Sequence, residues 1–158
     1  MNKELFLQAY EKNSKSIYTV AYNYLKNSDD AAEITQETFM KLYTSEENFK
    51  SDEHIKAWLI RAGINLCKNH LRNRKKFSDE PIPDDIPSKE EKQDNDLLEV
   101  VMQLPEKYRI PIHLFYYEDY SLKQIAKVLD LTEGTVKTRL KRGREKLQKM
   151  LRKDEWTL

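Results

Sequence analysis

Residues 121–153 read SLKQIAKVLDLTEGTVKTRLKRGREKLQKMLRK, a stretch that predicts a helix-turn-helix. Ser121 and Gln124 have the spacing of a capping box, which opens a short first helix. The apolar face of that helix consists of Ile125, Val128 and Leu129. The segment Asp130-Leu131-Thr132 ends the first helix, and Thr132 is a favourable N-cap for a second one.

The second helix of this pair carries its positive charge outward. Nine Lys or Arg residues and a single acid, Glu145, lie between Lys137 and Lys153. Its apolar side holds Val136, Leu140, Leu147 and Leu151, and its other side holds Gly134, Thr138, Lys141, Arg142 and Glu145. Such a helix can enter the DNA major groove, with cations on phosphates and a few side chains on base edges. The alternative is a solvated basic face on a core helix. The agreement of caps, turn and charge favours DNA binding.

The composition indicates a soluble, helix-rich protein of one domain or two small ones. The chain has 158 residues, 3 Gly, 5 Pro and 35% charged residues. No apolar run approaches the roughly 20 residues that span a bilayer, and the first residues, MNKELFLQAYEKN, lack a signal-peptide core. The single cysteine, Cys67, excludes an internal disulfide and suits a reducing cytosol.

The charge is segregated along the chain. Residues 1–76 hold 13 basic and 10 acidic side chains, a net +3, and residues 97–158 hold 13 and 9, a net +4. Residues 77–96, FSDEPIPDDIPSKEEKQDND, hold 2 basic and 8 acidic side chains, a net −6, and three of the five prolines. This composition predicts a flexible acidic linker between two basic domains.

The N-terminal domain is predicted to contain four helices, at residues 3–12, 14–26, 30–45 and about 54–76. The second has an apolar face made of Ile17, Val20, Ala21, Tyr24 and Leu25. No alternating β-branched run is long enough for a sheet. We therefore expect an all-α fold with two small helical domains, the second containing the helix-turn-helix.

Two of these helices carry unusual outer faces. On the 54–76 helix one stripe holds Trp58, Arg61, Asn65, Lys68, Asn69, Arg72, Lys75 and Lys76, which suits a nucleic-acid strand. The alternative is that Trp58 covers the core and the cations are solvated. On the 30–45 helix the outer face holds Asp29, Asp30, Glu33, Gln36, Glu37, Met40, Lys41 and Thr44. That face would repel DNA; it is either a protein-docking surface or a solvated one.

In its order of motifs the chain resembles the extracytoplasmic-function (ECF) sigma factors of bacterial RNA polymerase, within the sigma-70-like family. Residues 29–43, DDAAEITQETFMKLY, are similar to the family's polymerase-binding segment, with Glu33 where aspartate is frequent. Residues 57–72, AWLIRAGINLCKNHLR, resemble its −10 element segment, with Gly63 where alanine is usual. Residues 104–148 resemble its −35-binding domain.

The resemblance implies a transcription initiation factor that directs core polymerase to promoters and helps to melt them. It implies docking on the clamp coiled-coil of the largest subunit through Asp30, Glu33, Gln36, Glu37 and Met40. It implies contact with the melted −10 strand through Asn48, Phe49, Lys50, Ser51, Trp58, Arg61, Asn65, Lys68, Asn69 and Arg72. It implies contact with the −35 duplex through Gly134, Lys137, Thr138, Arg139, Lys141, Arg142 and Arg144. Lys137, Thr138, Lys141 and Arg142 would face −35 bases, and Arg139 and Arg144 would lie nearer phosphates. Arg142 can reach a base edge or a phosphate.

The same resemblance implies further partners. The C-terminal domain would meet the polymerase flap region, and the acidic linker would run through the RNA-exit region. About twenty extended residues reach roughly 70 Å, so both domains can engage one promoter together. The chain would be cytoplasmic, and an anti-sigma factor would hold it near the membrane without membrane insertion of this chain.

Other chemistry has weak support in the sequence. Cys67 and His70 have a C-x-x-H spacing but no further nearby ligands, so we expect no metal site. No phosphate loop or catalytic arrangement is identifiable, so we expect neither an enzyme nor a cofactor. Tyr108, Tyr116, Tyr117 and Tyr120 are expected to pack in the core or a hinge. Two rival functions remain: a stand-alone DNA-binding regulator, and a decoy that binds polymerase without promoter activity.

Overall fold

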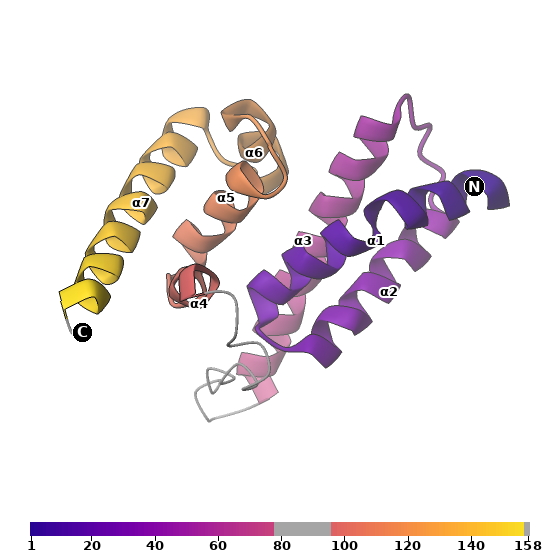
Figure 1. The fold of residues 1–158 in the computed structure, drawn as a ribbon. Coiled ribbons are helices and arrows are strands. Elements are labelled where there is room, and N and C mark those ends of the chain that lie inside the picture. Colours follow the sequence, from indigo (N-terminus) through magenta and orange to yellow (C-terminus); the bar gives the residue numbers. More distant parts are fainter. Residues whose placement is uncertain (78–95, 157–158) are drawn as a thin grey trace. The chain divides into compact units, whose positions relative to one another are not determined.

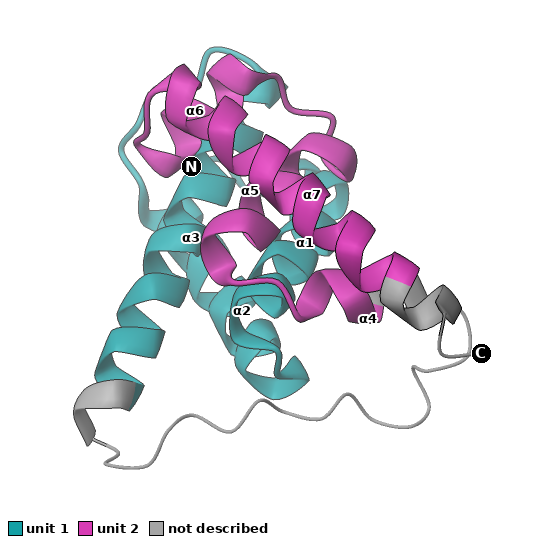
Figure 2. Ribbon diagram, turned by 90° about the vertical axis from the view of Figure 1, so that its left-hand side faces the viewer, with its two compact units in different colours: residues 1–85 teal, residues 86–158 magenta. Residues whose placement is uncertain are grey.

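The computed structural model describes residues 1–77 and 96–156, with side chains for 1–74 and 99–152. These residues form two compact units, Met1–Asp85 and Ile86–Leu158, whose boundary lies in the part of the chain that is not described (Figure 2). Within the described ranges the regular structure is helical. The expectation of an all-α protein is therefore confirmed, and each unit is presented by itself.

The first unit consists of three helices, α1 (Lys3–Leu25), α2 (Ser28–Thr44) and α3 (Asp52–Phe77), which pack against one another (Figure 1). The Asn2 side chain caps α1 by accepting hydrogen bonds from the backbone N–H groups of Glu4 and Leu5. Lys26 ends α1 in the left-handed conformation, with φ 55°. Asn27 then caps α2, whose first turn carries Asp29 and Asp30 at the positive end of the helix dipole.

The prediction of two separate helices at 3–12 and 14–26 was wrong, because α1 runs through this region without a break. Asn13 lies between the two predicted helices. Its side-chain Nδ2 donates to the carbonyl oxygen of Ala9, 2.9 Å away, and the residue is buried. An asparagine whose amide finds a partner one turn back can remain in a helix interior. The described residues 1–77 therefore contain three helices.

The core of the first unit follows the predicted apolar faces. Ile17, Val20, Ala21, Tyr24 and Leu25 of α1 are all buried, as predicted. From α3 the fully covered side chains include Leu59, Ile60 and Ile64, each at most 1% exposed. Burial of these groups anchors the three helices, so the opposite face of α3 is left at the surface.

The second unit consists of α4 (Asp96–Met102), α5 (Glu106–Tyr116), α6 (Leu122–Leu129) and α7 (Glu133–Trp156). The predicted capping box is present: Ser121 Oγ accepts from Gln124 N–H, and the Gln124 side chain accepts from Ser121 N–H. Asp130 turns the chain with φ 57°. Thr132 Oγ1 accepts from Thr135 N–H at 3.1 Å, as expected of the N-cap of α7.

Helix α7 is the centre of the second unit, since α4, α5 and α6 all pack against it. Val136 and Leu140 are buried, whereas Leu147 and Leu151 are half-buried. The buried Arg109 guanidinium donates to the carbonyl oxygen of Leu104 at 2.8 Å and joins the end of α4 to α5. This packing turns the charged side of α7 outward.

Most of the predicted linker, residues 78–95, lies outside the described residues. Its ends do not: α3 runs to Phe77 and α4 begins at Asp96. The domain limits 1–76, 77–96 and 97–158 stay a prediction. None of the helices in the described part of the chain combines the length and apolar character that crossing a bilayer requires.

Candidate nucleic-acid and protein interfaces

The exposed side of α3 presents the predicted strand-binding stripe. Arg61, Asn65, Lys68, Asn69 and Arg72 are all exposed, and Trp58 is half-buried at the start of the stripe. The side chains of Lys75 and Lys76 lie outside the described part. Cations, amides and one ring therefore share a single helix face, an arrangement that can hold phosphates and support an unstacked base.

The loop before α3 is tied to this stripe by an aromatic cluster. The Phe49 ring meets the Trp58 ring edge-on at 5.7 Å between centroids, and it meets the His54 ring at 5.2 Å. His54 Nδ1 also accepts a hydrogen bond from the backbone N–H of Lys50 at 3.1 Å. Edge-on ring contacts and this hydrogen bond hold the loop against the first turns of α3.

His54 is a site residue that the sequence interpretation missed. Its spacing of four from Trp58 was the available signal, because residues i and i+4 share a helix face. Ser51, predicted to contact the −10 strand, has a structural task as well. Its Oγ accepts from the backbone N–H of His54 at 3.1 Å, so Ser51 occupies the N-cap position of α3. Asn48 and Lys50 are exposed.

The outer face of α2 carries the predicted docking residues. Glu33, Gln36 and Glu37 are exposed, and Met40 is 62% exposed. Asp30 differs from them, because its Oδ2 lies 3.4 Å from both His70 Nε2 and Arg74 Nη1 of α3. The structure therefore groups four of the five residues on an open surface and turns the fifth toward α3.

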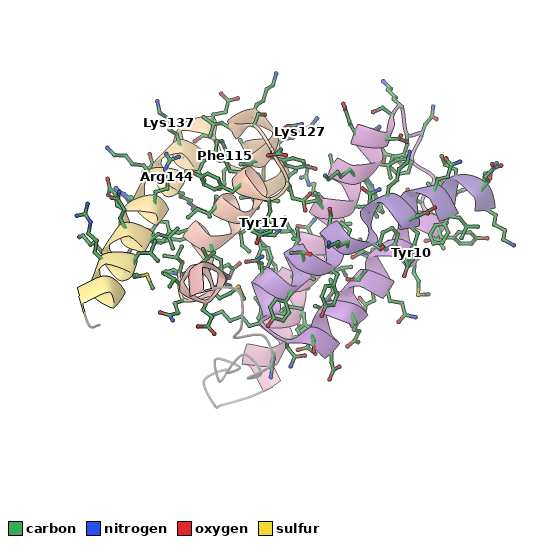
Figure 3. All side chains as sticks on the ribbon, in the orientation of Figure 1. Tyr10, Phe115, Tyr117, Lys127, Lys137 and Arg144 are labelled. Atoms are coloured by element: carbon green, nitrogen blue, oxygen red, sulfur yellow. The ribbon has the colours of Figure 1, made fainter. Side chains whose placement is uncertain are left out.

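Beside that surface lies an apolar groove of about 750 Å³ between α1 and α2. Its lining includes Tyr10, labelled in Figure 3, with Phe39 and Met40. Leu7 at its margin is 52% exposed and Tyr10 is 48% exposed. The sequence interpretation missed this groove, because the residues of α1 that line it were assigned to two separate helices. An exposed apolar lining beside acidic side chains suits a protein partner.

The basic face of α7 is open along its length. Gly134, Lys137, Thr138, Lys141, Arg142 and Arg144 are exposed, and Arg139 is half-buried. Lys137 projects from the first half of the helix (Figure 3). The Arg144 guanidinium donates to the hydroxyl oxygen of Tyr116 at 3.2 Å, so its position is set by α5.

The four tyrosines before the helix-turn-helix divide into two pairs. Tyr108 and Tyr120 are buried, as expected of packing residues, and burial is the main cause that raises the pKa of Tyr120. Tyr116 and Tyr117 are exposed, so the packing prediction was wrong for them. Tyr116 instead bonds Arg144, and the Tyr117 ring stacks on His113 at 5.0 Å. Both lie near the end of α5, where the core no longer covers them.

Cys67 and His70 do not form a ligand pair. Cys67 is fully buried in the first unit, whereas His70 faces Asp30. Among the side chains that the structure describes, no group of three His, Cys, Asp or Glu residues could hold a metal ion.

Comparison with known families matches both units. Residues 9–77 match sigma-70 region 2, and residues 94–147 match sigma-70 region 4. The chain is 33% identical to the RNA polymerase sigma factor SigV of Bacillus subtilis, over 97% of this chain and 95% of that protein. It is 30% identical to the ECF RNA polymerase sigma factor SigW of the same species, over 96% and 91%.

Two solved structures share the fold. One is the sigma factor RpoE with the anti-sigma factor NepR from Bartonella quintana, with a TM-score of 0.75 at 22% identity, covering 93% of this chain and 96% of that one. The other is CnrH with the cytosolic domain of CnrY, with a TM-score of 0.71 at 21% identity, covering 97% and 91%. The exposed basic helix, the polar stripe of α3 and these matches agree. The chain belongs to the ECF class of sigma-70 factors, the transcription initiation factors that direct RNA polymerase to promoters.

Proposed function

We propose that the two units divide the work of promoter recognition between them. The first unit binds core polymerase and the melted −10 strand, and the second binds the −35 duplex. The observation that carries this proposal is the presence of two different polar surfaces in one chain. The stripe on α3 combines amides and a ring with cations, whereas α7 presents mainly cations and small side chains.

For polymerase, the proposed contact is the open surface of α2. Glu33, Gln36, Glu37 and Met40 would meet the clamp coiled-coil of the largest subunit, with Asp30 at the edge of the contact. The exposure of these four side chains supports this role. Because Asp30 also pairs with Arg74, replacement of Asp30 would disturb the fold as well as the contact.

For the −10 element, the proposed contacts are the loop residues Asn48, Phe49, Lys50 and Ser51 and the exposed stripe of α3. An aromatic cluster that holds the loop beside Trp58 supports this role, since base capture needs a preformed surface. Asn65 and Asn69 would read base edges, and Arg61, Lys68 and Arg72 would hold phosphates.

For the −35 element, α7 would enter the major groove with Lys137, Thr138 and Lys141 toward the bases and Arg142 at a base edge or a phosphate. Arg139 and Arg144 would contact the backbone. The exposed first turn at Gly134 supports this docking, because nothing lies within 4 Å of a Cβ built there. The duplex could therefore approach the helix start closely.

We further propose an anti-sigma factor as a partner and the cytoplasm as the location, with no catalytic activity or cofactor in the chain itself. One of the two solved structures that share the fold is a sigma factor in complex with an anti-sigma factor, which supports the first point. The flap region of polymerase is the proposed partner of the second unit.

Run-off transcription with core RNA polymerase tests the function. We expect specific transcripts only when the protein is added, and sequencing of these transcripts identifies the promoters. A decoy would bind core polymerase without initiating. A stand-alone regulator would bind duplex promoter DNA without requiring core polymerase. Either result would overturn the proposal.

A further inference from the structure

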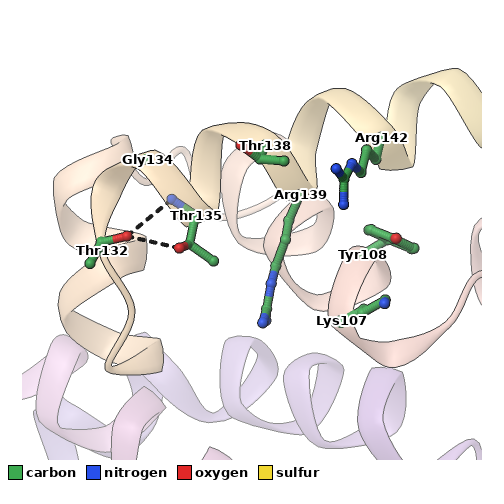
Figure 4. A pocket seen from close by; sticks show the side chains of 8 residues that line it. All are labelled: Lys107, Tyr108, Thr132, Gly134, Thr135, Thr138, Arg139 and Arg142. Atoms are coloured by element: carbon green, nitrogen blue, oxygen red, sulfur yellow. Dashed lines mark hydrogen bonds between the residues drawn. The ribbon is translucent and has the colours of Figure 1, made fainter.

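Three cations from two helices converge on one tyrosine in the second unit. The Lys107 Nζ atom lies 5.1 Å from the centre of the Tyr108 ring, and the Lys146 Nζ atom lies 5.6 Å from it. The Arg142 side chain extends from α7 toward the same phenol (Figure 4). Lys107 belongs to α5, whereas Arg142 and Lys146 lie one turn apart on α7. We refer to Lys107, Tyr108, Arg142 and Lys146 as the Tyr108 cluster.

The cluster borders a hollow in the surface beside the start of α7. The hollow has a volume of about 590 Å³ and is lined by Lys107, Tyr108 and Arg142 together with Thr135, Thr138 and Arg139 (Figure 4). It therefore joins the cluster to the part of α7 that would enter the major groove. Its lining supplies hydroxyl and cationic donors and lacks carboxylates.

The three cations also act on the Tyr108 phenol. Burial raises the pKa of this phenol, but Lys107, Lys146 and Arg142 lower it, and the net pKa lies below its ordinary value. A surface point that favours a phenolate also favours other oxyanions. The three cations are exposed, so a ligand can reach them from the solvent side.

We propose that the three cations of the Tyr108 cluster hold one phosphodiester of the DNA backbone beside the −35 element, with the phenol, which is 7% exposed but lines the hollow, as a further donor. This inference rests on the proposed docking of α7 and deepens it. It adds Lys107, Tyr108 and Lys146 to the DNA contacts and assigns Arg142 to the backbone.

The chemistry favours a phosphate over a base edge. A phosphate offers several acceptor oxygens and a negative charge, which match cations and a hydroxyl converging from two helices. A base edge offers a planar pattern that one bidentate side chain reads. Arg142 extends toward the phenol of Tyr108 on α5 (Figure 4), although it is exposed like Lys137, Thr138 and Lys141. The contact would fix the register of the helix on the duplex and would carry no base preference.

The test uses holoenzyme reconstituted with core polymerase and promoter duplexes that carry one neutral methylphosphonate at successive backbone positions across the −35 element. The protein variants are Lys107→Gln with Lys146→Gln, Arg142→Gln, and Tyr108→Phe, which keeps the ring. Lys3→Gln is the matched control, because Lys3 is an exposed lysine of the first unit. Affinity is measured at several salt concentrations.

We expect one backbone position at which the neutral linkage lowers the affinity of the unsubstituted holoenzyme about tenfold. In the double lysine variant, the neutral linkage at that position should lower the affinity by less than about twofold. The salt slope of its binding should be smaller by about one. Arg142→Gln should weaken all single-base variants of the −35 element equally. Tyr108→Phe should lose affinity by roughly threefold.

Two results would overturn the inference while leaving promoter recognition intact. One is a double lysine variant that behaves like Lys3→Gln. The other is a neutral linkage that lowers the affinity of the unsubstituted protein and of the double lysine variant by the same factor at every backbone position. An Arg142→Gln variant that relaxes preference at one base pair would return that residue to base reading. A holoenzyme that binds no promoter would refute the proposed function itself, and this inference with it.

Discussion

Gly143 of α7 lies directly against Ile112 of α5, so that a methyl group built at position 143 would meet Ile112 Cδ1 at 2.5 Å. The same methyl group would lie 3.3 Å from Tyr108 Cβ. Glycine therefore allows α5 to lie close against α7 at this point, and this contact places Lys107 and Tyr108 of α5 beside the cations of α7. Packing at one buried residue thus positions the proposed phosphate site.

Gly143→Ala should destabilise the second unit by about 1–3 kcal/mol, because the added methyl group overpacks a buried contact. Replacement of Ile112 by Val removes Cδ1 and costs about 0.5–1.5 kcal/mol by itself. The double variant should lose less stability than the sum of the two single losses, because the added methyl group and Ile112 Cδ1 are no longer both present. Urea denaturation of the four proteins measures this coupling. Strictly additive losses would show that the contact with Ile112 is not the cause.

Gly63→Ala should have the opposite effect, although Gly63 is also buried. A methyl group there would lie 3.5 Å from Thr38 Oγ1 and 3.6 Å from Ile17 Cγ2, which are ordinary contact distances. Alanine also loses less backbone entropy than glycine on folding, so the first unit should gain about 0.5–1 kcal/mol. Thermal unfolding provides the measurement. A decrease in stability would mean that α1, α2 and α3 pack more tightly here than these distances indicate.

Glu37→Lys should weaken binding to core polymerase by at least about tenfold, because it places a cation on the proposed docking surface. Glu37 is exposed, so the helical content should not change. Glu11→Lys is the matched control, an equal charge reversal at an exposed position of α1 outside the groove lining. A pull-down at moderate salt compares the two. If both variants bind equally well, the α2 surface is only solvated.

Asn65→Ala should impair promoter opening more than polymerase binding, since the amide would contact a strand that is exposed only after melting. Asn73→Ala serves as the comparison, because Asn73 is exposed on the same helix and lies outside the predicted stripe. Permanganate footprinting of unpaired thymines reports the opening. A normal bubble with Asn65→Ala would remove this residue from the strand contacts.

His113 should make the stability of the second unit sensitive to acid. Burial lowers its pKa from 6.5 to about 4, against a smaller opposing effect of Glu118. The unfolded chain therefore takes up a proton near pH 6.5 that the folded unit does not accept until about pH 4. Stability from this residue is complete above about pH 6.5 and falls by about 3 kcal/mol as the pH falls to about 4.

Urea titrations followed by the methyl signals of Leu114 and Leu140 between about pH 7 and about pH 4.5 measure this dependence. Carboxylates also contribute, so the quantity of interest is the difference from His113→Gln, which lacks the titrating ring. His54→Gln, a histidine of the first unit, is the control. Equal pH dependence with and without His113 would contradict the prediction.

The local features of the fold could be predicted from the sequence because they depend on residues within one helical turn. The capping box of Ser121 and Gln124 and the cap at Thr132 formed as expected. The helical period correctly identified the buried face of the helix predicted at residues 14–26, a face that belongs to α1. The prediction failed at Asn13, where the choice between ending and continuing a helix depended on burial against neighbouring helices.

By itself, the sequence determined most of the residues that face outward on α2, α3 and α7, since a period of 3.6 residues assigns each position to a face. Asp30 is an exception, because it is turned toward α3. Tertiary structure alone decided which side chains from distant parts of the chain lie next to one another. Asp30 meets His70 and Arg74 across two helices, and Tyr108 meets Arg142 and Lys146 across two others. The physical reason is that such meetings depend on how closely helices approach, as at Gly143, and periodicity carries no information about that distance.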